Sequence, residues 1–292
     1  MRKNSTSTKI WIILFLIPTA AVFCLLFAVP LFTTVVSSFT KWNGMEPMKF
    51  VGLDNYIKIF QSKDFLTALK NTLIWAAAAA FIHVPFGVIV ALVLYRKRKG
   101  WKFVRSSFMI PNMISKTALA LMFTFIFKPD VGILNSFLRG IGLEKWTHNW
   151  LQEEATALFS ITNIWLWYAA LITLITFSEL TMISSELAES AKIDGATDLQ
   201  IDLLIYLPLL KRIIGTGVVI AVVGVFKEFE TIFITTNGGP GNATMNLAMM
   251  MYNRIMNSSQ YGYANALGVL LLLLSIGVLV ICNKLFAMDK ED

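Results

Sequence analysis

The chain has 292 residues, of which 56% are hydrophobic and only 15% are charged. Because average soluble domains carry about 25% charged residues, this composition excludes an ordinary soluble domain. The net charge of +7 does not indicate nucleic-acid binding, because the basic residues lie between apolar runs rather than on one face of a soluble domain.

Six apolar segments predict an all-α, polytopic membrane protein, because each is long enough for a bilayer-spanning helix of about 20 residues. They lie at about 10–38, 71–95, 104–127, 155–178, 212–235 and 264–283. The first segment follows Met1-Arg2-Lys3, as a secretory signal would. Its uncharged run continues to Thr40, however, which predicts a retained membrane helix.

Cysteine and histidine give no sign of a disulfide or a metal site. Cys24 and Cys282 lie in apolar runs far apart in the sequence, and His83 and His148 are isolated. We therefore expect buried packing cysteines, and neither a metal ligand nor a cofactor in this chain.

Lys and Arg residues predict the orientation. Six of them, between Arg96 and Arg105, occupy the link between the second and third spans, which the positive-inside rule places in the cytoplasm. Both termini of this plasma (inner) membrane protein are then cytoplasmic. The predicted parts are a cytoplasmic N-terminus at 1–9, a first helix at 10–38, an external segment at 39–70, a five-helix core at 71–283 with a cytoplasmic loop at 179–211, and a cytoplasmic tail at 284–292.

The cytoplasmic segment from Glu179 to Arg212 is too polar to span a membrane and too regular to be disordered. One helical face is indicated by Leu180, Ile183, Leu187 and Ala191. Gly195 suits the left-handed residue that ends a helix, and Thr197 with Gln200 forms a capping box for a second helix. The sequence therefore predicts two short amphipathic helices joined by a glycine turn.

This helix pair either lies flat on the membrane or binds another protein. Interfacial helices are usually rich in Lys and Arg. Here the acidic residues Glu179, Glu186, Glu189, Asp194, Asp198 and Asp202 outnumber Lys192, Lys211 and Arg212. Because acidic helices are poorly placed beside an anionic leaflet, a cytoplasmic protein partner is favoured.

Three short motifs, Glu189-Ser190-Ala191, Asp194-Gly195-Ala196 and Leu207-Pro208, resemble the EAA loop of binding-protein-dependent ABC permeases. Ser190 stands where that family usually has Ala. The resemblance implies a type I (MetI-like) importer permease core, in which this loop docks into a groove of a cytoplasmic ATPase. The residues that it assigns to this coupling are Glu186, Glu189, Ser190, Ala191, Asp194, Gly195, Ala196 and Pro208.

Further motifs resemble the sugar-permease branch of that family, which includes the maltose, glycerol-phosphate and multiple-sugar importers. They are Gly52-Leu53-Asp54-Asn55-Tyr56, Asn71-Thr72, Thr236-Asn237-Gly238-Gly239-Pro240 and Tyr261-Gly262-Tyr263-Ala264-Asn265-Ala266. The resemblance implies four kinds of partner: a second homologous permease chain, two cytoplasmic ATPase subunits, an extracellular solute-binding protein, and a sugar or oligosaccharide substrate. The chain has no GxxxxGK[ST] motif, so we expect no enzyme activity, with ATP and Mg on the ATPase subunits.

Ionisable residues inside a membrane span are costly and mark candidate functional sites. Carboxylates, amides and aromatic faces are the groups that suit a sugar. In the maltose-type permeases the substrate contacts come from the fourth and fifth spans. The matching candidates are Glu228, Tyr168, Trp167, Asn163, Lys227 and Phe229.

Each of these candidates also has a structural interpretation. Lys227 can pair with Glu228 or Glu230, and Trp167 can face lipid. Lys116, in the third span, is expected to pair with a carboxylate or to extend its ammonium towards the interface.

Three other classes of protein fit part of the sequence. An ABC permease for an amino acid, peptide or polyamine would keep the EAA loop, and the Gly-Gly-Pro segment argues against it. An ion-coupled secondary transporter would explain the charges within the membrane but not the acidic helix pair. A membrane enzyme has no metal cluster or nucleophile motif to support it, and Glu228 and Glu230 point to different sides of a helix.

Overall fold

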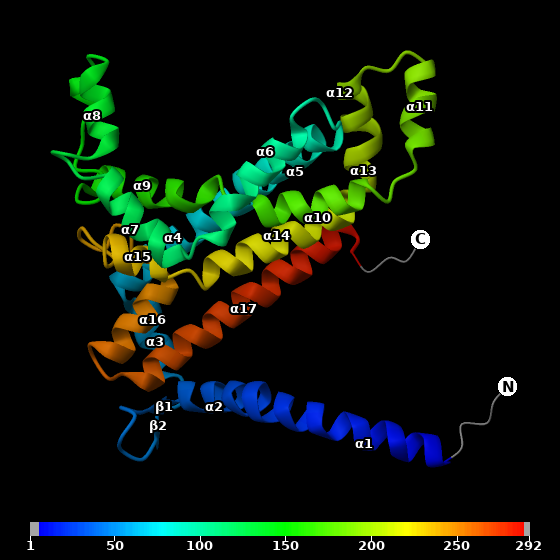
Figure 1. Cartoon of the computed structure of the whole chain (residues 1–292). Coiled ribbons are helices and arrows are strands. Elements are labelled where there is room, and N and C mark those ends of the chain that lie inside the picture. Colours follow the sequence, from blue (N-terminus) through cyan, green and yellow to red (C-terminus); the bar gives the residue numbers. More distant parts are fainter. Residues whose placement is uncertain (1–5, 289–292) are drawn as a thin grey trace. The chain divides into compact units, whose positions relative to one another are not determined.

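The computed structural model describes residues 6–288, and side chains from residue 11 onwards. The predicted terminal segments therefore lie partly outside the described residues, at 1–5 and 289–292. Within the described range the chain is almost entirely helical (Figure 1), and the expected all-α class is confirmed.

The helices are α1 (Thr6–Phe23), α2 (Val29–Ser38), α3 (Asp54–Gln61), α4 (Lys63–Ala78), α5 (Val84–Tyr95), α6 (Trp101–Met109), α7 (Lys116–Ile126), α8 (Ile133–Gly140), α9 (Glu154–Leu166), α10 (Ala170–Leu180), α11 (Ser185–Ile193), α12 (Asp198–Ile201), α13 (Leu207–Leu209), α14 (Lys211–Phe226), α15 (Glu230–Thr235), α16 (Leu247–Met256) and α17 (Tyr261–Phe286). Three π-helical turns join neighbouring helices at Cys24–Ala28, Ala79–His83 and Asp202–Tyr206. Short 3-10 turns lie at Ile110–Met113 and Glu144–Trp146. Strands β1 (Thr40–Lys41) and β2 (Lys49–Phe50) form an antiparallel hairpin.

Four helices of the described chain are long and apolar enough to cross a membrane without a break. They are Trp11–Ser38, Lys63–Tyr95, Glu154–Leu180 and Tyr261–Phe286. Two bent pairs bring the number to six if each pair is one span: Trp101–Met113 with Lys116–Ile126, bent by 96°, and Asp198–Leu209 with Lys211–Thr235, bent by 72°. The six expected spans are all present if each bent pair is one span, and the third is then not the straight helix that its apolar run suggested.

The break in the third span has a local cause. Pro111 has no backbone N–H to continue the helical ladder, and Ile114 and Ser115 are extended. Ser115 then caps the next helix, because its Oγ accepts a hydrogen bond of 3.2 Å from the backbone N–H of Ala118.

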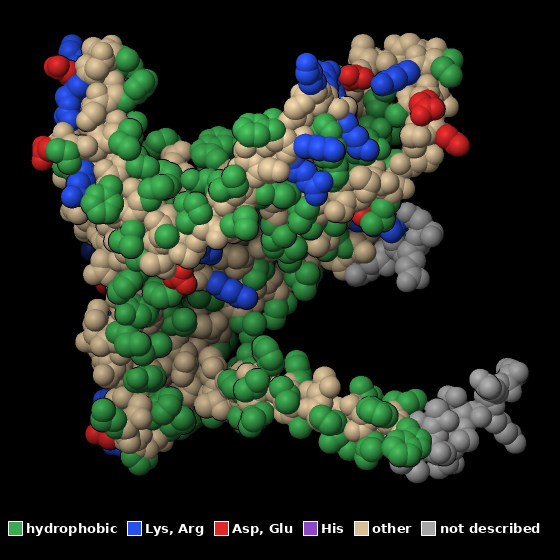
Figure 2. Space-filling view, viewed as in Figure 1, with side chains coloured by type: hydrophobic (Ala, Val, Ile, Leu, Met, Phe, Trp, Pro, Cys, Tyr) green, Lys and Arg blue, Asp and Glu red, His purple; other side chains and the backbone are tan. Residues whose placement is uncertain are grey.

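The described chain divides into two compact units. The first comprises Met1–Ser62 and Met251–Leu270, and the second comprises Lys63–Met250 and Leu271–Asp292. In the first unit, α1 and α2 form a long apolar helix, and none of its most apolar stretch is buried within the chain. Figure 2 shows hydrophobic side chains along its visible surface. Such an exposed apolar surface suits contact with lipid or with another protein.

The second unit is built around α5, α10 and α14, which pack against one another. Its buried core includes Val84, Val88, Ala91, Ile172, Phe177, Leu180, Tyr206 and Leu210. Close approach of α5 and α10 depends on Gly87, whose carbonyl accepts a 3.0 Å hydrogen bond from Thr173 Oγ1.

Two buried polar residues explain one of the sequence motifs. The Asn71 amide donates 2.9 Å hydrogen bonds to the carbonyls of Ala243 and Met245, and Thr72 Oγ1 accepts a 3.0 Å bond from the N–H of Leu247. These contacts satisfy backbone N–H and C=O groups of an irregular segment, which would find no water to bond with inside a bilayer. The Asn-Thr pair thus holds the segment after the Gly-Gly-Pro turn against α4.

We predict that Gly87→Ala lowers stability even though Ala is the better helix former. The added Cβ would lie 2.8 Å from Ile172 Cβ and 3.1 Å from Ala169 Cβ, and such overpacking costs about 1–3 kcal/mol. Thermal unfolding of the purified protein in detergent is the measurement. Gly277→Ala on α17 is the matched control, because an added Cβ there meets nothing within 4 Å; equal stability of the two variants would contradict this packing account.

Candidate functional site

The expected pair of short helices within residues 179–211 is present as α11 and α12, and local hydrogen bonds define its ends. Ser184 Oγ accepts a 3.3 Å bond from the N–H of Glu186 at the start of α11. Gly195 has a φ of +83°, in the left-handed region that the sequence predicted for it. The N–H of Ala196 bonds to Ala191 O at 2.9 Å, and that of Gly195 bonds to Lys192 O at 3.0 Å. This double closure is a Schellman motif.

The predicted capping box is also confirmed. The N–H of Gln200 donates to Thr197 Oγ1 at 3.3 Å, while Gln200 Oε1 accepts from the N–H of Thr197 at 2.8 Å. Because both helix ends are closed by the chain itself, the turn from Asp194 to Thr197 has a defined geometry before any partner binds.

Ion pairs tie this loop to the basic link that follows α5. Arg96 contacts both Asp198 and Asp202, and Arg98 and Lys192 each lie 3.6 Å from an Asp198 carboxylate oxygen. Figure 2 shows the resulting group of Lys and Arg side chains beside α12, with acidic side chains on neighbouring α11. Asp198 and Asp202 are therefore engaged within the chain, and the carboxylates of Glu186 and Glu189 remain exposed on α11.

The two faces of α11 differ. Ala188, Ala191 and Ala196 are half-buried against the apolar core of the second unit. Leu187 belongs to the predicted apolar face but is 48% exposed, and Ile193 is 87% exposed. The remaining predicted coupling residues, Glu186, Glu189, Ser190, Asp194, Gly195 and Pro208, are all exposed. The outer surface thus combines acidic and apolar groups, as a protein-docking surface does.

A second candidate site is a cavity of about 350 Å³ inside the second unit. It lies where the break before α7 meets the interruption between α14 and α15, because α7 contacts α15 and the lining includes Ile114, Lys116 and Glu228. Its polar lining consists of His83, Asn112, Lys116, Trp165, Tyr168, Glu228 and Thr231. Most of the other lining residues are aliphatic, and this combination is typical of a small-molecule pocket.

Glu228 is the centre of the cavity's polar network. Its side chain is 8% exposed and forms an ion pair with Lys116, whose side chain is 63% exposed. Glu228 Oε1 also accepts hydrogen bonds from the N–H and Oγ1 of Thr231, at 3.2 and 2.9 Å. The Glu228 carbonyl accepts a 2.5 Å bond from the Asn246 amide. The expected pairing of Lys116 with a carboxylate is confirmed, and Glu228 pairs with Lys116 rather than with Lys227.

The cavity also holds donor and acceptor groups that are not used within the chain. Trp165 Nε1 is buried and has no hydrogen-bond partner among the described residues. His83 Nδ1 lies 2.8 Å from Leu166 O and must donate, since a carbonyl only accepts. In the neutral ring, Nε2 is then left as an acceptor. A buried, unpaired N–H is costly, so a bound solute that reached the Trp165 N–H would relieve that cost.

Of the substrate-site candidates from the sequence, Glu228 and Tyr168 line the cavity. The lining does not include Asn163, Trp167, Lys227 or Phe229. Trp167 Nε1 instead donates to Asn163 Oδ1 at 3.2 Å, its ring packs edge-on to Phe86, and its side chain is 46% exposed. Ile164, Trp165 and Tyr168 of the same stretch do line the cavity, so Asn163 and Trp167 lie on another face of it. His83 and Asn112 had no sequence signal, because only the fold brings them to this point.

Comparison with known proteins gives the family. Residues 83–286 match the family described as the binding-protein-dependent transport system inner membrane component. The chain is 35% identical over 283 residues to the probable ABC transporter permease protein YurN of Bacillus subtilis (strain 168), with 96% of this chain and 97% of the relative covered. It is 32% identical to the multiple sugar-binding transport system permease protein MsmF of Streptococcus mutans serotype c (strain ATCC 700610 / UA159), with 92% of each covered.

A solved structure shares the fold. A chain of a bacterial alginate ABC transporter, determined in complex with an alginate pentasaccharide-bound periplasmic protein, superposes with a TM-score of 0.86 at 21% identity, with 100% of both chains covered. The present chain belongs to the binding-protein-dependent transport system inner membrane component family. It is a multi-pass permease subunit of an ABC importer, and therefore a transport protein rather than an enzyme.

The glycine turn yields a prediction about coupling. Gly195→Pro removes the N–H that bonds to Lys192 O and forces a negative φ, so it should break the turn. We expect the membrane-expressed variant to lose its co-purifying ATPase subunits while the membrane helices remain folded. Gly195→Asn is the matched control, since Asn tolerates the left-handed region. Equal ATPase recovery with all three chains would show that this turn does not couple the subunits.

Proposed function

We propose that this permease forms, with a second homologous permease chain, the pathway for a sugar or oligosaccharide. An extracellular solute-binding protein delivers the substrate, and two cytoplasmic ATPase subunits hold ATP and Mg and drive transport. The observation that carries the proposal is the cavity at the two helix breaks, with its unpartnered Trp165 N–H and its Lys116–Glu228 pair. The similarity to MsmF, a permease protein of a multiple sugar-binding transport system, supports the same substrate class.

The chemistry of the cavity suits a polyhydroxylated solute. A sugar hydroxyl both donates and accepts, so it can take the N–H of Trp165 and donate to a neighbouring acceptor such as His83 Nε2. Lys116 has further N–H groups beyond the one that faces Glu228. Tyr168 and Trp165 add aromatic surface for the C–H patches of a sugar ring. The substrate site of this half of the transporter therefore centres on Glu228, Lys116, Trp165 and Tyr168.

The membrane orientation follows from charge. Arg96, Lys97, Arg98, Lys99 and Lys102 lie within seven positions of one another at the end of a span, so the positive-inside rule puts them, the termini and α11 on the cytoplasmic side. The exposed carboxylates of Glu186 and Glu189 then face the ATPase. Closure of the ATPase dimer acts on the permease only if the ATPase binds one permease state more tightly than the other.

We predict that Trp165→Phe weakens solute binding and leaves assembly intact. This change removes the unpartnered N–H and keeps an aromatic ring, so the half-saturating solute concentration for uptake should rise about tenfold, the value of one lost hydrogen bond in a pocket. Uptake by proteoliposomes with purified binding protein and ATPase measures it. Trp167→Phe is the control, because Trp167 lies outside the cavity lining; an identical response of the two variants would argue against this cavity as the solute site.

We predict that Glu228→Gln lowers uptake at least tenfold. The amide oxygen still caps Thr231, but the negative charge that attracts Lys116 to the cavity is lost. Glu230→Gln, two residues away on exposed surface, should retain uptake. If Glu228→Gln transports normally, the pair has no part in the pathway.

A further inference from the structure

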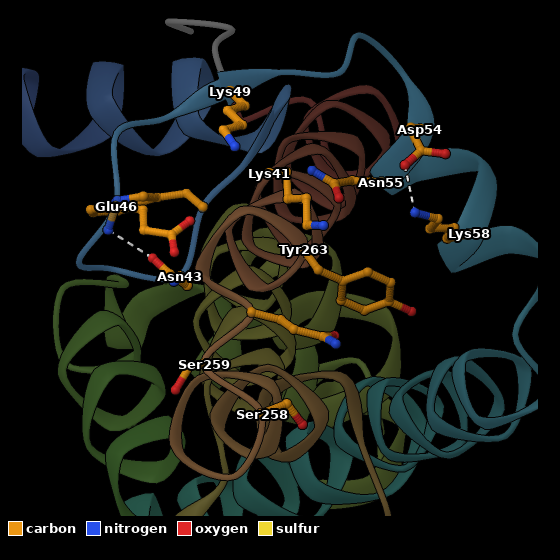
Figure 3. A pocket seen from close by; sticks show the side chains of 12 residues that line it. Lys41, Asn43, Glu46, Lys49, Asp54, Asn55, Lys58, Ser258, Ser259 and Tyr263 are labelled. Carbon is orange, nitrogen blue, oxygen red and sulfur yellow. Dashed lines mark hydrogen bonds and ion pairs between the residues drawn. The ribbon is translucent and has the colours of Figure 1, made fainter.

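A second cavity, of about 400 Å³, lies wholly within the first unit and was not identified from the sequence. Its walls are the β1–β2 hairpin, the start of α3 and the turn between α16 and α17 (Figure 3). It lies at the meeting point of two motifs from the sequence, Gly52–Tyr56 and Tyr261–Ala266. These motifs have no role in the membrane cavity described above.

Buried contacts give this pocket a fixed shape. The Asn55 amide donates to the carbonyls of Ser38 and Thr40 at 2.8 and 2.9 Å. At Gly262 a Cβ would lie 1.9 Å from the Thr40 carbonyl oxygen, so only glycine allows the backbones to approach. The ring of Trp42 packs 5.3 Å from that of Tyr261. The two motifs therefore build the pocket, which exists before any ligand binds.

The charges in this pocket are arranged unfavourably for the isolated chain. Lys41 and Lys49 are directly opposite each other across the hairpin, and both line the cavity. Like charges in directly opposite positions destabilise a sheet. Among the described residues, Lys58 is paired with Asp54 at 2.6 Å, whereas no ion pair within 4.0 Å engages Lys41 or Lys49.

The other charges near the pocket do not remove this repulsion. The one remaining carboxylate in the lining is that of Glu46, at the turn that Asn43 caps with bonds of 3.1 and 2.9 Å. Arg254 adds another cation nearby, 4.9 Å from the ring of Tyr263. The lining thus keeps a net positive charge. A departure from local pairing rules, at a pocket whose shape is fixed by buried contacts, is the kind of feature that marks a binding site.

The surroundings indicate a protein rather than a free anion. Met45 is 95% exposed and Phe50 is 80% exposed, so apolar side chains flank the lysines on the hairpin. Protein interfaces combine such exposed aromatic and methionine side chains with a polar rim. The hairpin directly follows the first membrane helix, so in the proposed orientation it lies outside the cell.

We propose that this pocket receives an acidic side chain of the extracellular solute-binding protein, between Lys41 and Lys49. The inference rests on the proposed function, because that function supplies the partner. A carboxylate between the two ammonium groups would turn their repulsion into two attractions. The gain exists only when the partner is docked, and exposed lysines act mainly on the rate of encounter.

The test compares Lys41→Gln/Lys49→Gln with wild type in the assembled transporter, in nanodiscs of zwitterionic lipid. The probe is the purified binding protein that supports uptake in the proteoliposome assay. We expect its association rate to fall about tenfold at low salt, and the difference from wild type to shrink as salt rises and screens the charges. Lys41→Arg/Lys49→Arg should retain the wild-type rate, because it keeps both charges.

The control variant is Lys63→Gln/Lys145→Gln, which removes two exposed lysines that lie outside the pocket and also outside the cell in the proposed orientation. Thermal unfolding of Lys41→Gln/Lys49→Gln should stay at the wild-type temperature or rise, since a like-charge contact is removed. This result would separate lost docking from lost folding.

Two outcomes overturn the docking proposal while the proposed function stands. One is an unchanged association rate in Lys41→Gln/Lys49→Gln, and the other is an equal loss in the control, which would indicate the general field of the surface. If uptake by the wild-type transporter needs no binding protein, the proposed function fails as well, so the two failures are distinguishable.

Discussion

Interrupted helices within a membrane have to satisfy their own backbone, and in this permease the Lys116–Glu228 pair stands where two interruptions meet. Hydrocarbon offers no water to the N–H and C=O groups that a break releases. Glu228 caps the N-terminal end of α15 through Thr231, Asn246 covers the Glu228 carbonyl, and Ser115 caps α7 one residue before Lys116. The ion pair then joins α7 to the α14–α15 break. The cavity between the bent spans exists because these polar groups hold both breaks open.

The same groups decide which parts of the cavity remain for a solute. Glu228 Oε1 is already engaged twice by Thr231, so this carboxylate is as much a structural element as a ligand. Trp165 Nε1 has no partner, and Lys116 keeps much of its side chain exposed. A solute with hydroxyl groups could bond to the remaining donors and acceptors of the cavity without breaking the bonds of Glu228 to Thr231. A purely apolar solute would leave the indole N–H unsatisfied.

Features that depend on residues close together in the sequence could be predicted, and features that depend on residues far apart in the sequence could not. The Schellman turn at Gly195 and the capping box at Thr197 depend on residues three to five positions apart, and the sequence alone predicted both. The span count followed from apolar runs in the same way. Asp198 and Asp202 were counted in the acidic excess that favoured a protein partner, but Arg96, about a hundred positions earlier, pairs with both. His83 reaches the cavity through packing of α5 on α10, which no local pattern encodes. Trp167 and Asn163 carried the right chemistry, but they lie four residues apart on one helical face and bond to each other outside the cavity lining.

Helix α5 connects the two candidate sites of the second unit. Its N-terminal end follows His83 in the cavity lining, and its C-terminal end precedes Arg96, which holds α12 through Asp198 and Asp202. Twelve residues of helix extend about 18 Å at 1.5 Å per residue. Gly87, in the first turn of this helix, packs closely against Ile172 and accepts a hydrogen bond from Thr173, both on α10. The contacts form one continuous connection, in which ion pairs join Asp198 and Asp202 to Arg96 at one end of α5 and the His83 ring at the other end bonds to Leu166 O beside Trp165. Helix α5 links the two sites directly, and each contact at its ends can be removed by a single substitution.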